Sequence, residues 1–300
     1  MKITVAGGTG FLGSSIVRSL LDRGHEVTVL GRDPSKVPLL PLLRGADAAR
    51  GDVTDPESLR GAFDGAEAVV GAVQFPNHPV EVPRKGLTYD LYDRRGTENL
   101  LAEARRANVG HYVYISGAGA SITSDKTWYR AKGYAEKAVK DSGIPYAILR
   151  PSWAYGPGDK ALNKIAAIAR VSPVVPILGA GVQRVQPVHV DDIAEAVARI
   201  FEVGSSWGNT FEIGGAVLTM RQITETLVEV LGKKRAIVPI PLPLAKLGTA
   251  PLVLLPAPPM TPLGVEFAAQ DGLVDTTATT EVLGVTPVEL RTGLKRYLGR

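Results

Sequence analysis

The chain has 300 residues, 45% of them hydrophobic, and its 34 Lys and Arg against 30 Asp and Glu give a formal net charge of +4. This length is enough for one large α/β domain, or for a core domain with a smaller lobe. Because cysteine is absent, disulfides, thiolate metal sites and cysteine nucleophiles are excluded. The four histidines lack ligand spacing and the basic residues are interspersed with acidic ones, so we expect neither a metal site nor nucleic-acid binding. The N-terminal residues have the pattern of a strand and not that of a signal peptide, which predicts a cytoplasmic protein.

The first 21 residues have the pattern of a nucleotide-binding βαβ unit. Residues 2–6 predict a short buried strand, and apolar residues at helical spacing over 16–21 predict the helix that follows. Gly7, Gly10 and Gly13 have the spacing with which a chain turns off a strand, approaches a pyrophosphate and packs a helix closely on the sheet. The helix start adds free N–H groups and a partial positive charge. We predict that a dinucleotide contacts Gly7, Thr9, Gly10, Phe11, Leu12 and Gly13.

The end of the second strand predicts which dinucleotide binds. Residues 27–30 alternate as a strand and end at Gly31, where an acidic side chain would bind the 2′-hydroxyl of NAD. Arg32 follows instead, with Lys36 close by, and basic side chains suit the 2′-phosphate of NADP. The pattern favours NADP, while a contact from Asp33 to the ribose leaves NAD open.

The next elements continue the alternation of strands and helices. A third strand ends at Asp52 and Val53, which we place beside the adenine, and Pro56 predicts a helix start capped by Thr54 or Asp55. Further strands are predicted over 68–73, 111–116 and 146–149, with helices over 88–107 and 128–142. Small residues at the end of the fourth strand, Gly71 and Ala72, leave space for the cofactor. The fold class is therefore α/β, a Rossmann-type doubly wound parallel sheet with residues 1–150 as its dinucleotide-binding core.

Residues 151–300 are more irregular and predict the remaining core elements interleaved with a small lobe. Trp153 and Tyr155 lie in the loop after the sixth strand, so we expect them in the wall of the substrate site. Proline and glycine predict turns over 173–181, and helices are expected over 191–201 and 219–231. Asp191 or Asp192 is expected to cap the first of these helices.

Residues 236–265 form an unusual apolar segment with a single charged residue, Lys246, and eight prolines. Repeated proline makes it too broken for a transmembrane helix. It is interpreted as an apolar lobe packed on the core, or as a surface that docks on a membrane, a lipid-like substrate or a protein partner.

Taken together, these motifs resemble the extended and atypical short-chain dehydrogenase/reductase superfamily over nearly the full chain. Within it, the chain is most similar to the group that contains the accessory NAD(P)H-binding subunit of respiratory complex I and its bacterial relatives. The resemblance implies a cofactor site that includes Lys132 and Pro151, and a peripheral membrane or respiratory-complex partner at 236–265. The matching segments are 7–13, 52–53, 96–100, 112–116, 132–136, 149–152, 155–159 and 188–194.

The catalytic motif of that superfamily is altered here. Its oxidoreductases use a Tyr four residues before a Lys, which places both on one helix face so that the phenol can transfer a proton as hydride moves. Lys132 is present, but Trp128 occupies the Tyr position and Tyr129 lies three residues before the Lys. The family Ser aligns with Ala118, which leaves Ser121 or Ser124 as alternative candidates for its role. Ser116 stands at the strand end and is expected in the site wall together with Trp128. Lys132 and Tyr129 are the candidate catalytic residues.

Three functions remain open from these residues. The first is an atypical NAD(P)H-dependent oxidoreductase on an apolar carbonyl or quinone-like substrate, taking its proton from Tyr129 or water. The second is a non-catalytic, cofactor-binding structural or assembly protein of a respiratory or membrane complex. The third, a sugar-nucleotide epimerase or dehydratase, is disfavoured by Trp128 and by the weakly polar second half.

Overall fold

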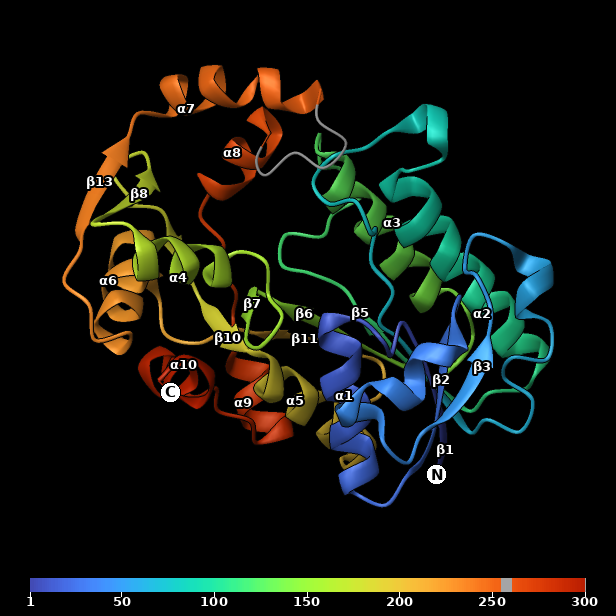
Figure 1. The fold of residues 1–300 in the computed structure, drawn as a ribbon. Helices are drawn as coiled ribbons and strands as arrows, with labels where there is room; N and C mark the ends of the chain where they lie inside the picture. The colour runs from blue at the N-terminus through green and yellow to red at the C-terminus, as the bar shows by residue number, and fades with distance from the viewer. Residues whose placement is uncertain (255–260, 300) are drawn as a thin grey trace.

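The computed structural model describes residues 1–254 and 261–299, and its centre is a seven-stranded parallel sheet (Figure 1). The strand order is β11-β6-β5-β4-β1-β2-β3, which reverses direction between β1 and β4 as in a doubly wound sheet. These strands are β1 (Lys2–Ala6), β2 (Glu26–Gly31), β3 (Asp47–Arg50), β4 (Ala68–Gly71), β5 (His111–Ile115), β6 (Tyr146–Pro151) and β11 (Asn209–Ile213). The predicted fold class is confirmed.

Helices cover both faces of the sheet, so each face has its own apolar core. On one face, α1 (Phe11–Asp22) and α5 (Val190–Glu202) pack against each other, with α1 over β1 and β2 and α5 over β6. On the other, α2 (Gly96–Arg106) and α3 (Thr127–Lys140) cover β4, β5 and β6. A turn of π-helix, Asp90–Arg95, leads directly into α2.

The C-terminal lobe arches away from the C-terminal edge of this sheet (Figure 1). Its helices are α4 (Leu162–Val171), α6 (Met220–Val230), α7 (Leu242–Thr249), α8 (Pro262–Ala268) and α10 (Leu290–Leu298), while α9 (Thr277–Leu283) packs beside β11. Its short strands are β7 (Trp153–Tyr155), β8 (Val174–Leu178), β9 (Arg184–Val185), β10 (Pro187–His189), β12 (Leu218–Thr219) and β13 (Ala236–Ile240). A third core, which includes Tyr155, Leu227 and Leu294, joins three helices of this lobe, α4, α6 and α10, while α7 and α8 pack against each other.

Three local predictions were wrong. Residues 174–178 form strand β8, not turns, because their β-branched side chains pair in parallel with β13. The helix expected from Pro56 is a single 3₁₀ turn, Pro56–Leu59, although Asp55 does cap it by accepting from the Glu57 N–H. The cap of α5 is His189 and not Asp191 or Asp192. The His189 side chain is buried directly before the helix, and its Nδ1 accepts from the Asp191 N–H at 3.2 Å.

The apolar segment 236–265 is built from β13, α7, a 3₁₀ turn and α8 in its described parts. Residues 255–260, which include the whole Pro-Ala-Pro-Pro-Met run, lie outside the described residues. Across residues 1–254 and 261–299, no helix has the length and apolar character needed to cross a bilayer.

Candidate functional site

The glycine loop between β1 and α1 has a backbone geometry that larger residues cannot adopt. Gly7 has φ +82°, and its N–H donates to the Leu30 carbonyl at 3.1 Å. A Cβ on Gly13 would lie 2.2 Å from the Gly7 carbonyl oxygen, and one on Gly7 would lie 2.8 Å from that of Ala72. The Gly10 N-cap of α1 makes no side-chain cap bond, and no acidic residue stands in the first turn. The loop therefore fits a dinucleotide pyrophosphate, since the N–H groups of Phe11, Leu12 and Gly13 lack intrahelical partners.

The strand ends bring the predicted cofactor residues to one edge of the sheet. Ala6 is in register with Leu30 of β2 and Gly71 of β4. The Ala72 N–H donates to the Ala6 carbonyl at 2.9 Å. A Cβ on Gly71 would lie 2.5 Å from the Tyr112 hydroxyl, so the glycine accommodates this buried tyrosine.

The predicted adenine residues follow β3 and are held in place locally. One carboxylate oxygen of Asp52, Oδ1, accepts from the N–H and hydroxyl of Thr54 at 2.9 and 2.8 Å. Val53 is 8% exposed and packs against Gly96, the first residue of α2. A Cβ on Gly96 would lie only 2.9 Å from Val53 Cγ2. Both remain predictions as cofactor contacts.

The ribose edge contains a second arginine that sequence analysis missed. Arg50 at the end of β3 is in register with Gly31, so it lies level with the residue before Arg32. Both arginines are exposed, and neither guanidinium has a hydrogen bond or ion pair within residues 1–254 and 261–299. Asp33, by contrast, accepts from the Ser35 hydroxyl at 2.5 Å and lies 3.6 Å from Lys36. The Ser35 hydrogen bond, with Lys36, lowers the pKa of Asp33, so the carboxylate is charged and already engaged.

Lys132 lies on α3 in a buried ion pair. Its Nζ is 2.9 Å from Asp93 Oδ1 and donates to the Ile115 carbonyl at 3.2 Å, with the two paired side chains 3% and 0% exposed. Asp93 Oδ2 accepts from the Phe75 N–H at 3.1 Å. Burial alone would lower the pKa of Lys132, but Tyr114 and Asp93 together raise it above the ordinary lysine value. Because burial raises the pKa of Tyr114 to about 12, the phenol is neutral at pH 7 and Asp93 supplies the negative charge.

Trp128 and Tyr129 lie side by side over the loop that follows β5, with ring centroids 4.6 Å apart. A Cβ on Gly117 would lie 3.0 Å from Trp128, and one on Gly119 would lie 2.8 Å from Tyr129. The Tyr129 ring is half-buried, and burial raises the pKa of its phenol. Tyr129 would therefore serve as a proton donor more readily than as a base.

Ser116 is engaged in a polar network beneath this loop. Its hydroxyl donates to Glu136 Oε1 at 2.6 Å, and Arg150 binds both oxygens of the same carboxylate at 2.8 and 2.6 Å. Ser116 and Glu136 are both buried. The geometry gives Ser116 a structural role in positioning α3 on β5.

The two wall residues predicted after β6 both pack in or against the third core. Trp153 is half-buried in β7, and Tyr155 is fully buried in the third core, its ring 5.2 Å from that of His189. A Cβ on Gly293 would lie 2.0 Å from the Tyr155 hydroxyl, so this side chain points toward α10. Pro151 ends β6, and its carbonyl accepts from the Ala118 N–H at 3.0 Å.

Comparison with known proteins agrees with this arrangement. Residues 7–202 match the NAD(P)H-binding family. The chain is 30% identical over 255 residues to NADH dehydrogenase [ubiquinone] 1 alpha subcomplex subunit 9, mitochondrial, of Arabidopsis thaliana, covering 83% of this chain and 62% of that protein. It is also 30% identical over 265 residues to 2-alkyl-3-oxoalkanoate reductase of Stenotrophomonas maltophilia, covering 78% of this chain and 77% of that protein.

Solved structures show the same fold. The UDP-glucose 4-epimerase of Thermotoga maritima, solved with UDP-glucose, superimposes with a TM-score of 0.79 at 24% identity, covering 99% of this chain and 97% of that one. This likeness concerns the fold. The resemblance to short-chain dehydrogenases/reductases and to complex I subunits is thereby confirmed, and the chain belongs to the NAD(P)H-binding family.

Proposed function

We propose that this protein is an NADP(H)-dependent oxidoreductase acting on an apolar carbonyl or quinone-like substrate. The observation that carries the proposal is the loop from Gly7 to Gly13, where a Cβ at position 13 would overlap the Gly7 carbonyl and the start of α1 is uncapped. The relatives with reductase activity support the redox assignment. When bound, the nicotinamide would supply or accept the hydride.

The proton in this proposal comes from Tyr129. Its phenol is neutral and half-buried beside Trp128, whereas the Lys132 ammonium is held by Asp93. We expect Tyr129→Phe to lower kcat by at least about 100-fold, the lower end of general-acid contributions. The measurement is NADPH oxidation across a panel of quinones and aldehydes.

Tyr134→Phe is the matched control, because Tyr134 lies on the same helix and is 42% exposed. Its activity should equal that of the unmodified protein. Equal activity in Tyr129→Phe would show that water supplies the proton. Tight NADPH binding without turnover on any substrate would contradict the oxidoreductase and favour a cofactor-binding structural protein.

The preference for NADP rests on Arg32 and Arg50. Charge-assisted hydrogen bonds are worth about 1.5–3 kcal/mol, so Arg32→Ala or Arg50→Ala should weaken NADPH binding by roughly 10- to 100-fold and leave NADH affinity nearly unchanged. Isothermal titration with both nucleotides measures this. Arg105→Ala, an exposed arginine in the last turn of α2, is the control for charge alone. Equal loss for both nucleotides would contradict the assignment.

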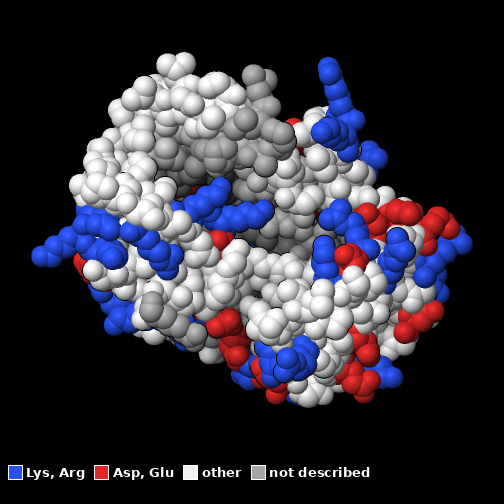
Figure 2. Space-filling model, viewed as in Figure 1, with Lys and Arg blue, Asp and Glu red and all other residues white. Residues whose placement is uncertain are grey.

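A second candidate function, docking on a membrane or respiratory-complex partner, is favoured by the outer face of the C-terminal lobe. Leu244 and Leu247 on α7 are 59% and 72% exposed, and Val238 on β13 is 42% exposed. The lobe surface over α7 and β13 is nearly free of charged side chains in Figure 2, while lysine and arginine gather just below it. Respiratory-complex relatives support a partner of this kind.

Membrane docking is tested on the two exposed leucines. We expect Leu244→Glu with Leu247→Glu to abolish co-sedimentation with vesicles of phosphatidylglycerol and phosphatidylcholine, because each glutamate would have to be desolvated at the bilayer. Leu39→Glu is the control, since Leu39 is 76% exposed on the Rossmann core. Co-sedimentation that survives the double substitution, or that is absent from the unmodified protein, would contradict membrane docking.

A further inference from the structure

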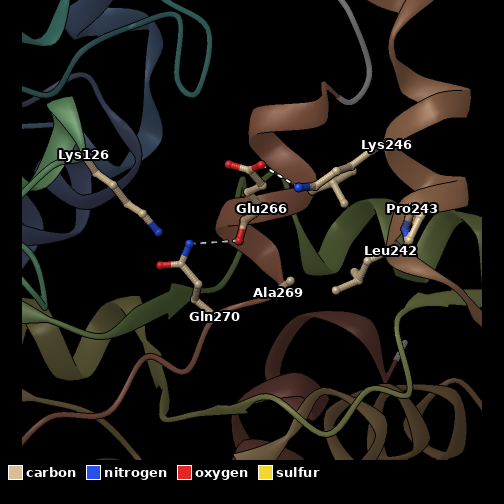
Figure 3. Close-up of a pocket in the computed structure, with 8 residues that line it drawn as sticks. Lys126, Leu242, Pro243, Lys246, Glu266, Ala269 and Gln270 are labelled. Carbon is tan, nitrogen blue, oxygen red and sulfur yellow. Dashed lines mark hydrogen bonds and ion pairs between the residues drawn. The ribbon is translucent and has the colours of Figure 1, made fainter.

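A cavity of about 590 Å³ lies where the C-terminal lobe meets the start of α3 (Figure 3). This volume is in the range of small-molecule sites. Most of its exposed lining is apolar, and the apolar residues come from α7 and from α8 with the residue that follows it, namely Leu242, Pro243, Val265 and Ala269. An apolar chain would therefore be desolvated against this side.

Four residues supply the polar lining of the cavity, and their charges do not cancel. Lys246 Nζ lies 2.5 Å from Glu266 Oε1, so these two charges neutralise each other. Lys126 forms no ion pair within residues 1–254 and 261–299, but its charge adds to that of Lys246 in lowering the pKa of Glu266. Two lysines against one glutamate leave the cavity with one net positive charge. Figure 3 shows the Lys126 ammonium and the Gln270 amide pointing toward one another, away from Leu242. One Gln270 N–H donates to the Glu266 carbonyl at 3.0 Å, which leaves its second N–H for a ligand.

The charged end of the cavity is close in sequence to the candidate catalytic residues. Lys126 is the residue directly before α3, two positions before Trp128 and three before Tyr129. A group held by Lys126 would therefore lie near the start of α3, with its apolar part extending toward α7 and α8.

We propose that this cavity binds a substrate that carries a carboxylate on a long apolar chain in addition to its reducible carbonyl, with the carboxylate on Lys126 and Gln270 and the apolar chain against Leu242 and Ala269. This proposal rests on the proposed oxidoreductase function and names its substrate class. An ammonium head group would be repelled by the net positive charge of the cavity, and an uncharged alcohol would forgo the ion pair.

The test compares three ligands of equal chain length, dodecanoate, dodecanol and dodecylammonium, by isothermal titration below their aggregation concentrations. We expect dodecanoate to bind at least tenfold more tightly than dodecanol, and Lys126→Gln to remove that difference. Lys140→Gln is the matched control, because Lys140 is an exposed lysine at the opposite end of the same helix. Ala269→Trp should weaken both dodecanoate and dodecanol by filling the cavity, with Ala269→Leu in its place if the larger residue prevents folding.

NADPH titration of the same variants separates this proposal from the proposed function. Equal affinity for dodecanoate and dodecanol, or no effect of Lys126→Gln, overturns the substrate class even where NADPH is bound and oxidised. Selective dodecanoate binding that depends on Lys126, in a protein that never oxidises NADPH, supports the cavity assignment and contradicts the reductase. Unchanged NADPH affinity in Lys126→Gln is expected, because this lysine faces the cavity and not the glycine loop.

Discussion

Gly13→Val is expected to lower NADPH affinity by at least about 100-fold, or about 2.8 kcal/mol. The Cβ alone would lie 2.2 Å from the Gly7 carbonyl oxygen and 2.8 Å from the Gly8 Cα. Both contacts are backbone, so the loop has to move as a unit and cannot relieve the overlap by a rotamer change. Overpacking of this kind also costs roughly 1–3 kcal/mol of stability. Isothermal titration and a thermal melt measure the two effects.

Gly204→Val separates the local clash from the general cost of replacing a glycine. No atom lies within 4 Å of a Cβ placed on exposed Gly204. This variant should bind NADPH as the unmodified protein does. NADPH binding by Gly13→Val at full affinity would contradict the assignment of the loop as the pyrophosphate site.

Asp93→Ala is expected to destabilise the protein by about 3–5 kcal/mol, because it leaves the buried Lys132 ammonium without its counter-charge. The paired side chains are 3% and 0% exposed, and the Asp93 carboxylate also accepts from the Phe75 N–H. Asp93→Leu combined with Lys132→Met should recover most of the loss, since no buried charge then remains. Urea denaturation measures the free energy of unfolding in each case.

The pH dependence of Asp93→Ala has a definite sign. In the intact protein the pKa of Lys132 is raised. The Lys132–Asp93 ion pair therefore stabilises the folded state fully at pH values below the ordinary lysine pKa. In the variant, unpaired burial lowers the pKa of Lys132. The loss of stability should therefore be largest at acidic pH and shrink as pH rises and the amine is neutralised.

Asp141→Ala provides the exposed counterpart on the same helix. Its ion pair with Lys137 is 2.5 Å long with both side chains about 60% exposed, so its removal should cost no more than about 1 kcal/mol. A similar cost for Asp93→Ala would show that the buried pair contributes no more than a surface one.

The fold and the position of the cofactor loop were accessible from local sequence pattern. The glycine spacing, the apolar strands and the helices between them depend on neighbours along the chain, and the seven-stranded sheet confirms the fold class they predict. Strand β8 was missed because prolines and glycines at its borders are typical of turns. Its partner strand, β13, lies more than 50 residues further along the sequence.

The sequence by itself therefore determined the doubly wound sheet and the glycine loop, and it predicts an altered Tyr position at Trp128. Only the tertiary structure showed that Arg50 lies beside Gly31 and that Lys132 pairs with Asp93. It also showed that Tyr155 is buried in the third core, and that Lys126 lines one cavity together with residues of α7 and α8. The physical reason is the distance along the sequence over which each kind of interaction acts. Turn geometry and amphipathic periodicity act between close neighbours in sequence, whereas strand register, ion pairing and cavity shape depend on which distant segments pack together.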